Sequence, residues 1–419
     1  MFDGMLSAEY LNLYQQSRYR DRISLLTETL VSLKYLVEVI VERVHEWIRF
    51  TKYCDDLSID IPSTIYAHEV ENYLQWRFPE GSQSRHRFIK ASLRIFIEAD
   101  DQGKFSRRVK SPVKPTTALF KEWVPPYLHF LKQHRGVSEK TLRKNILALN
   151  EFTKFLEQRS ILIIKNLTSI DIHDFCIGRG SRKPITWSSY MGIIRRFLRY
   201  VFLREGLERD LSFAVGSSKC FRYSGIHDVL TESEVSKILV SVDRSNAIGR
   251  RDYAILLLAA HYGMRPSDIR LLCLDNIHWR QGQIAFHQSK TRRQLILPLL
   301  PEVSEALIDY LRGGRPSTQS RNIFVRHKAP FEPYVPENNF SQIMSKALRR
   351  AGMDQRPGAR GLYLFRHTLA TNMLGADLPI KTIGDIMGHA STTSTYGYMK
   401  VDLPHLRSAS LSIAEVLNE

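Results

Sequence analysis

The chain has 419 residues, enough for two or three domains that each bury a hydrophobic core. It carries 60 Lys and Arg residues against 43 Asp and Glu residues, a formal net charge of +17, and 43% of its residues are hydrophobic. This composition excludes a disordered basic tail. It favours a folded protein whose partner is a polyanion, most commonly nucleic acid.

The first predicted element is a long amphipathic helix, because apolar residues recur at alternating intervals of three and four from Ile23 to Trp47. The apolar stripe is wide, which suits a helical bundle better than a two-stranded coiled coil, although pairing with a partner helix stays open. Further helices are predicted over residues 66–77 and 84–100. Together these elements predict a helical domain at residues 1–115.

A linker is predicted at residues 100–117, where Gly, Ser, two prolines and five basic residues occur without apolar periodicity. Two strong helices follow, over residues 139–159 and 186–206, and Gly206 is the expected stop of the second. These helices predict a second helical domain at residues 116–215.

A second linker is predicted at residues 215–228, before Thr231 and Glu234, which have the spacing of a capping box and open a helix. Residues 274–299 alternate apolar and polar side chains around two turns, which predicts a small antiparallel sheet. Helices are expected to resume at residue 302 and to continue to the end. The fold class is therefore mainly α, with a small antiparallel β-sheet in a third domain at residues 228–419.

The chain has four cysteines at widely separated positions, Cys54, Cys176, Cys220 and Cys273. No close pair could begin a zinc site or a disulfide framework, so we expect reduced thiols. The N-terminal segment lacks the basic and apolar regions of a signal peptide, and the longest nearly apolar run, Tyr253–Met264, is too short to span a bilayer. We therefore expect a soluble cytoplasmic protein without a membrane partner.

Four segments of the third domain stand out, although each is weak evidence alone: HYGMRPSDIRLL (261–272), QSKTRR (288–293), LYLFRHTLATNML (362–374) and IMGHASTTSTYGYMKVD (386–402). In this order and with these intervals they resemble the tyrosine recombinase (phage integrase) family. The resemblance covers residues 228–410, with a looser match of residues 116–210 to the family's core-binding domain. It implies a mixed α/β catalytic domain behind helical N-terminal bundles.

The resemblance also implies a set of catalytic residues. Arg265 takes the place of the family's first arginine, in a Gly-x-Arg segment, and Lys290 that of the lysine in a hairpin turn. Arg366 takes the place of the arginine in the His-x-x-Arg box, and His389 that of the histidine in the Leu-Gly-His segment. Tyr398 lies nine residues after His389, the family's interval for the nucleophile, whereas its competitor Tyr396 lies two residues short of it.

These residue types suit phosphodiester cleavage. Two guanidiniums, those of Arg265 and Arg366, can hold the nonbridging oxygens through bidentate hydrogen bonds. The Lys290 ammonium can give a proton to the leaving 5′ oxygen, and Tyr398 would keep the bond energy in a 3′-phosphotyrosine link. We therefore expect neither a metal nor a cofactor.

One departure concerns the His-x-x-Arg box, where Tyr363 stands in place of the histidine. A phenol with its usual pKa near 10 is a poor base at neutral pH but still a hydrogen-bond donor. Tyr363 is therefore expected to orient the phosphate, while His389 or water receives the proton. Asp268, three residues after Arg265, either orients that arginine or is a solvated charge in the first turn of the next helix.

Basic residues cluster on the two helices of the second domain. Candidate contacts to the DNA backbone are Lys140, Arg143, Lys144, Arg195, Arg196 and Arg199. A DNA clamp would explain this clustering, and merely solvated helix faces are the alternative.

The sequence thus predicts a site-specific recombinase or integrase of a mobile element that acts on double-stranded DNA in the bacterial cytosol, as a homo-oligomer or with related recombinases. Two alternatives stay open. One is a DNA-binding partner subunit that has lost turnover through Tyr363. The other is a type IB topoisomerase, which uses similar residues to relax supercoils.

Overall fold

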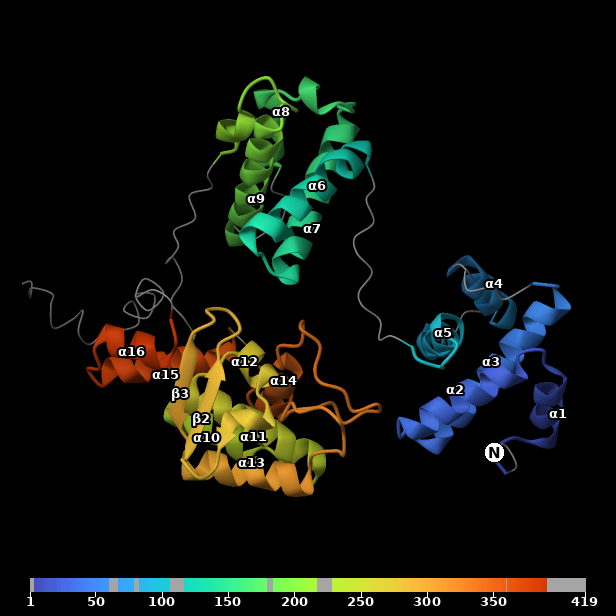
Figure 1. Ribbon diagram of the computed structural model, residues 1–419. Coiled ribbons are helices and arrows are strands. Elements are labelled where there is room, and N and C mark those ends of the chain that lie inside the picture. Colours follow the sequence, from blue (N-terminus) through green and yellow to red (C-terminus); the bar gives the residue numbers. More distant parts are fainter. Residues whose placement is uncertain are drawn as a thin grey trace, which may run out of the picture. The chain divides into compact units, whose positions relative to one another are not determined.

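The computed structural model describes residues 4–59, 67–78, 83–105, 117–178, 184–216, 228–358 and 360–389 (Figure 1). The chain divides into two compact units, residues 106–224 and residues 1–105 with 225–419. Within the second unit, the N-terminal and C-terminal parts have separate hydrophobic cores. The predicted domain boundaries at 115 and 215–228 fall on or beside residues outside the described ranges, so the three-domain division stays a prediction.

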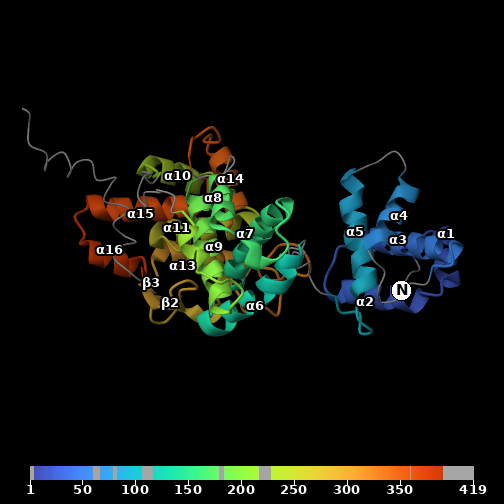
Figure 2. The ribbon, with the colours of Figure 1, turned by 90° about the horizontal axis from the view of Figure 1, so that it is seen from above.

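The N-terminal part contains helices joined by turns, with no strand among its described residues. Its helices are α1 (Ala8–Gln16), α2 (Arg20–Ser32), α3 (Val37–Asp56), α4 (Ala67–Arg77) and α5 (Gln83–Glu98). Helix α3 contacts α1, α2 and α5 (Figure 2). Trp47 is fully buried in the core and donates from Nε1 to the Ser92 carbonyl at 2.9 Å.

The single long helix predicted from Ile23 to Trp47 is wrong, because α2 and α3 are separate helices. Lys34 adopts a left-handed conformation with φ of 58°, and the Tyr35 amide donates back to the Leu30 carbonyl at 3.1 Å. This turn reverses the chain. Both helices nevertheless bury their apolar stripes in the same core, so the periodicity in the sequence continues across the break.

Residues 117–216 form a helical bundle of α6 (Ala118–Arg135), α7 (Glu139–Gln158), α8 (Ser169–Ile177) and α9 (Pro184–Leu203). Helices α7 and α9 correspond to the two predicted helices. However, α9 ends at Leu203, before the expected stop at Gly206. A Cβ on Gly206 would lie 2.3 Å from the Trp123 ring, so close packing explains this glycine.

Residues 228–389 form the mixed domain. Its helices are α10 (Glu232–Val240), α11 (Ala247–Tyr262), α12 (Pro266–Leu271), α13 (Pro301–Gly313), α14 (Ser341–Arg350), α15 (Tyr363–Gly375) and α16 (Ile380–Ile386). Both hydrogen bonds of the capping box predicted at Thr231 and Glu234 are present. Helix α11 carries the nearly apolar run and packs against α10, α13 and α15. No helix in the described ranges is long and apolar enough to cross a membrane.

The predicted antiparallel sheet is confirmed, with strands β1 (Ile277–His278), β2 (Gln283–His287) and β3 (Gln294–Pro298) in the order β1-β2-β3. His287 pairs with Gln294, so residues 288–293 form the turn between β2 and β3. The prediction that helices simply continue after residue 302 is wrong. Residues 314–340 are irregular, and they include four prolines, which interrupt helices.

Candidate active site

Arg265 is positioned by the junction between α11 and α12. Gly263 ends α11 in a left-handed conformation with φ of 56°, and Arg265 is the extended residue before Pro266 begins α12. Its side chain is only 7% exposed. Nη2 donates to the Gly388 carbonyl at 3.4 Å, whereas the buried Nη1 has no hydrogen-bond partner among the described residues.

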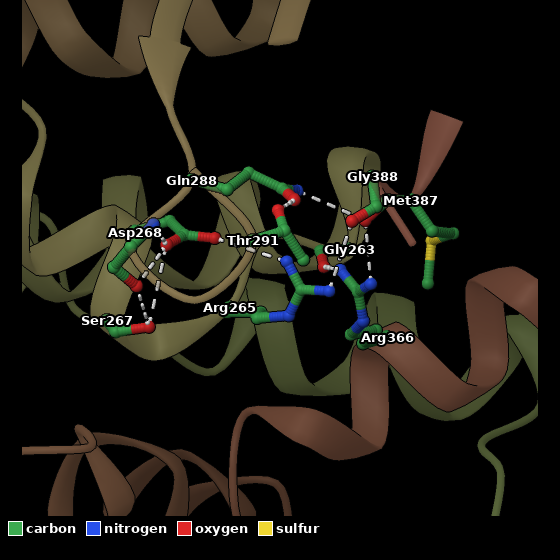
Figure 3. A network of polar contacts seen from close by, with 10 residues as sticks. Gly263, Arg265, Ser267, Asp268, Gln288, Thr291, Arg366, Met387 and Gly388 are labelled. Atoms are coloured by element: carbon green, nitrogen blue, oxygen red, sulfur yellow. Dashed lines mark hydrogen bonds and ion pairs between the residues drawn. The ribbon is translucent and has the colours of Figure 1, made fainter. Parts of the chain in front are cut away.

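Arg366 reaches the same place from α15. It is 4% exposed, and it donates from Nη1 to the Gly263 carbonyl at 2.6 Å and from Nη2 to the Met387 carbonyl at 2.7 Å. Figure 3 shows the Arg265 and Arg366 guanidiniums side by side, below the backbone of Met387 and Gly388. Two buried positive charges from different segments therefore converge at one point.

Asp268 connects Arg265 to the turn between β2 and β3. Asp268 is only 3% exposed, which rules out the solvated charge that was one of the two alternatives from the sequence. Its Oδ2 lies 3.7 Å from Arg265 Nη1, while its Oδ1 accepts from the Ser289 amide at 2.9 Å and from the Ser289 hydroxyl at 2.6 Å. One carboxylate thus holds an arginine and the residue before Lys290.

Lys290 lies in that turn with its side chain exposed. The turn closes through the Gln288 amide, which donates to the Arg293 carbonyl at 2.9 Å, and through the Arg292 amide, which donates to the Gln288 carbonyl at 2.9 Å. An ammonium on an exposed turn can swing toward a bound substrate, whereas the two arginines are fixed.

His389 follows α16 and is 9% exposed. Its amide donates to the Gly384 carbonyl at 2.8 Å, and its carbonyl accepts from Arg293 Nη1 at 3.0 Å. Burial, reinforced by the positive charges of Arg366, Arg265 and Lys290, lowers the pKa of His389 to about 4. The structure therefore brings four of the predicted catalytic residues into one electrostatic environment.

This low pKa predicts a neutral imidazole at pH 7. Because only the folded state disfavours the charged form, folding stability should fall as the pH drops from about 6.5 toward 4. In an NMR titration of the full chain, the imidazole resonance that disappears in His389→Gln should shift with a midpoint near 4. A midpoint near the ordinary value of 6.5 would contradict burial among cations.

Tyr363 is the first residue of α15 and is 46% exposed. Its ring lies against His367, with centroids 6.4 Å apart, and its hydroxyl takes no part in the hydrogen bonds that hold the two arginines. Tyr396 and Tyr398 lie outside the described residues, so the choice of Tyr398 as the nucleophile stays a prediction.

The predicted DNA-contact residues lie on α7 and α9, and several make internal contacts. Arg195 donates to the Val215 carbonyl at 2.8 Å, Arg199 forms an ion pair with Asp210, and Lys144 Nζ donates to the Ser189 hydroxyl at 2.5 Å. The side chains of Lys140, Lys144, Arg196 and Arg199 are exposed, while those of Arg143 and Arg195 are half-buried.

Gln288 is a residue of this site that sequence reasoning missed. It is 3% exposed, and its side chain contacts Thr291 and the Met387 carbonyl. The sequence did contain a signal for a buried side chain at position 288. Alternate residues along this strand point inward, namely Ile284, Phe286 and Gln288. A glutamine on the apolar face of a strand implies a buried hydrogen-bonding partner.

Residues 228–404 match the family described as "Phage integrase family", and residues 124–205 match "Phage integrase, N-terminal SAM-like domain". The protein "Putative integrase/recombinase y4rA" of Sinorhizobium fredii is 33% identical over 289 residues, which cover 69% of this chain and 70% of that relative. The chain belongs to the phage integrase family. The predictions of family, fold class and enzyme class are confirmed, and the chain is a tyrosine site-specific recombinase.

Other relatives of this recombinase are more distant. The tyrosine recombinase XerD of Listeria monocytogenes is 25% identical over 286 residues, covering 66% of this chain and 93% of that relative. Among solved structures, XerH recombinase bound to a palindromic difH substrate has a TM-score of 0.54 at 17% identity, covering 74% of this chain and 92% of XerH. A lambda integrase dimer bound to a COC′ core site has a TM-score of 0.50 at 18% identity, covering 66% of this chain and 94% of the lambda integrase chain. These two likenesses show the recombinase fold.

Proposed function

We propose that this recombinase cleaves and rejoins double-stranded DNA through a covalent 3′-phosphotyrosine bond to Tyr398. The observation that carries the proposal is the convergence of two buried guanidiniums, with Arg265 Nη1 buried and without a hydrogen-bond partner among the described residues. The nearest acceptor, Asp268 Oδ2, lies 3.7 Å from this nitrogen, within ion-pair range but too far for a hydrogen bond. A buried charged donor without a hydrogen bond costs free energy, and a phosphate oxygen would supply the missing acceptor.

Arg265 and Arg366 would hold the scissile phosphate. Two nitrogens of Arg366 are fixed by the backbone of Gly263 and Met387, so this guanidinium is already ordered before substrate binds. Attack on the phosphate concentrates negative charge on its nonbridging oxygens, and fixed donors stabilise that charge without reorganisation. This arrangement is suited to the transition state of phosphoryl transfer.

Lys290 would act on the leaving group. As the Tyr398 oxygen forms its bond to phosphorus, the bond from phosphorus to the 5′ oxygen breaks, and that oxygen takes a proton from the Lys290 ammonium. The freed 5′ hydroxyl of a second DNA end can then attack the phosphotyrosine, which reverses the cleavage step and joins the two DNA strands. Asp268 would fix the turn that presents Lys290 through its two hydrogen bonds to Ser289.

His389 and Tyr363 would have different parts. A neutral His389 can accept a hydrogen bond or a proton from the nucleophile, and a bound phosphate would offset the neighbouring cations and raise its basicity. Tyr363 would serve as a hydrogen-bond donor to the DNA backbone, to which its exposed side chain is open. Water is the other candidate acceptor of the nucleophile's proton.

We further propose that residues 1–115 bind DNA or assist assembly, and that the basic residues of α7 and α9 contact the backbone of the duplex. The name of the relative, integrase/recombinase, supports DNA recombination, and the lambda integrase dimer on its core site supports action as an oligomer on DNA. Action on mobile-element DNA and a cytoplasmic location are parts of the same proposal. A mixed assembly with related recombinases is the other arrangement that would support strand exchange.

The test is to incubate the full chain with duplex DNA from the ends of its own genetic element, nicked near the exchange point so that cleavage is irreversible. We expect a protein–DNA adduct that survives denaturing electrophoresis, and strand exchange between two copies of the same DNA without the nick. Salt-sensitive binding without any adduct would favour a noncatalytic partner subunit. Relaxation of supercoiled plasmid without site preference would favour a topoisomerase.

A further inference from the structure

Gln288 is the first residue of the turn between β2 and β3, the turn that carries Lys290. Its backbone amide and carbonyl close the turn that carries Lys290, through Arg293 and Arg292 respectively. Its side chain is buried to all but 3% beneath that turn. A glutamine with both its backbone and its side chain engaged at one turn is well placed to determine the position of that turn.

The carboxamide of Gln288 contacts two different segments. Its Oε1 accepts from the Thr291 hydroxyl at 2.6 Å, and its Nε2 donates to the Met387 carbonyl at 3.2 Å. Because a carbonyl can only accept, the nitrogen must face Met387, which fixes the orientation of the amide. Figure 3 shows the carboxamide between Thr291 and the backbone of Met387.

The same Met387 carbonyl accepts from Arg366 Nη2 at 2.7 Å. One backbone oxygen is therefore shared by the arginine that would hold the phosphate and by the glutamine that holds the Lys290 turn. Arg293 adds a second link, from Nη1 to the His389 carbonyl at 3.0 Å, but its side chain is exposed. Gln288 is therefore the buried link between the Lys290 turn and the Met387–His389 segment.

Gly388 leaves the space that the carboxamide occupies. It has a left-handed φ of 61°, and a Cβ built on it would lie 2.1 Å from Gln288 Nε2. The segment before His389 and the amide thus fit closely, with no room for a side chain between them. A rotation of the amide would break the link to Met387 rather than be absorbed by a gap.

We propose that Gln288 is a positioning residue that couples the Lys290 turn to the Met387–His389 segment, so that the general acid and Arg366 act in one fixed frame. This inference rests on the proposed function, in which Lys290 protonates the leaving oxygen. Its specific consequence is that loss of Gln288 should impair leaving-group protonation and spare phosphate binding.

A substrate with sulfur in place of the bridging 5′ oxygen at the scissile phosphate separates these effects. When the bond from phosphorus to sulfur breaks, the thiolate leaves without needing a proton, because thiols are far more acidic than alcohols. Cleavage of the sulfur substrate therefore requires the arginines and the nucleophile, but not the general acid. The scissile position is mapped first from the covalent adduct of the wild type.

The variant is Gln288→Met, which keeps the length of the side chain and removes both hydrogen bonds. We expect single-turnover cleavage of the oxygen substrate to fall about 10-fold to 100-fold, and cleavage of the sulfur substrate to stay within about 3-fold of wild type. Lys290→Ala should show the same pattern. Gln294→Leu, a change of the exposed glutamine on the neighbouring strand, should leave both rates unchanged.

Thr291→Val is the second variant, and it keeps the inference testable if Gln288→Met fails to fold. It removes only the hydroxyl that donates to Gln288, and it lies on a turn that should tolerate the change. It should show a smaller loss, again rescued by sulfur. Equal slowing on both substrates in these variants, or no slowing on either, would overturn the inference while leaving the wild-type adduct intact. Absence of a wild-type adduct on both substrates would instead overturn the proposed function, and this inference with it.

Discussion

Replacing Tyr398 by phenylalanine should abolish the covalent protein–DNA adduct while leaving DNA binding unchanged. Phenylalanine keeps the ring but lacks the oxygen that attacks phosphorus, and no other group can replace a nucleophile in the bond-forming step. The measurement is denaturing electrophoresis of the full chain after incubation with nicked element-end DNA, beside a mobility-shift assay on the same DNA.

Tyr396→Phe is the matched control, because it makes the same chemical change two residues away. It should form the adduct at close to the wild-type rate. Loss of the adduct in Tyr396→Phe and its retention in Tyr398→Phe would reverse the assignment. That assignment depends on the nine-residue interval from His389, since both tyrosines lie outside the described residues.

Replacing Arg265 by lysine should slow cleavage by about 100-fold to 1,000-fold, the usual cost of losing one fixed donor to a developing oxyanion. Lysine keeps the positive charge beside Asp268 but concentrates it on one nitrogen. It therefore cannot both donate to the Gly388 carbonyl and present a second nitrogen to the phosphate. Single-turnover cleavage rates and DNA affinity should be measured together.

The affinity for DNA should change far less than the rate, because phosphate charge interactions along the whole duplex dominate binding. Arg280→Lys is the control, since Arg280 is exposed in the turn between β1 and β2. A cleavage rate for Arg265→Lys within about 10-fold of wild type would show that a point charge suffices there, against the role proposed for its planar guanidinium.

Local patterns predicted much of the fold. The alternation around residues 274–299 identified the sheet, and the spacing of Thr231 and Glu234 identified the start of α10. The break at Lys34 escaped detection because a tight reversal can preserve apolar periodicity when both helices bury the same core. Helix α6 has no counterpart among the predicted elements, and it contains Pro125 and Pro126, which normally argue against a helix interior.

The candidate site was predictable where single residues occur at characteristic intervals. Those intervals identified Arg265, Lys290, Arg366 and His389, which the structure brings together. What the intervals do not contain is the set of supporting contacts. The choice between a solvated and a buried Asp268 depends on Ser289, a turn residue 21 positions further along the chain. The role proposed for Gln288 depends on a carbonyl 99 residues away.

The basic residues of α7 and α9 illustrate a different difficulty. Clustering of charge in sequence does not reveal which charges are already paired within the fold. Arg199 is paired with Asp210, and Arg195 holds the backbone at Val215, so contact with DNA would require each to share or exchange its partner. Lys140, whose side chain is exposed, is the simpler candidate for contact with the DNA backbone, whereas the exposed Arg196 also interacts with the Tyr127 hydroxyl.

The shared acceptor of this site is the backbone oxygen of Met387, and this affects how the site tolerates mutation. An alanine scan changes side chains and leaves every main-chain oxygen in place, so it would report position 387 only as a packing residue, buried with Ala370 and Ile383. The oxygen can be lost only by moving the chain. Position 388, where the smallest side chain would already collide with Gln288, is where a conservative-looking substitution should do the most harm.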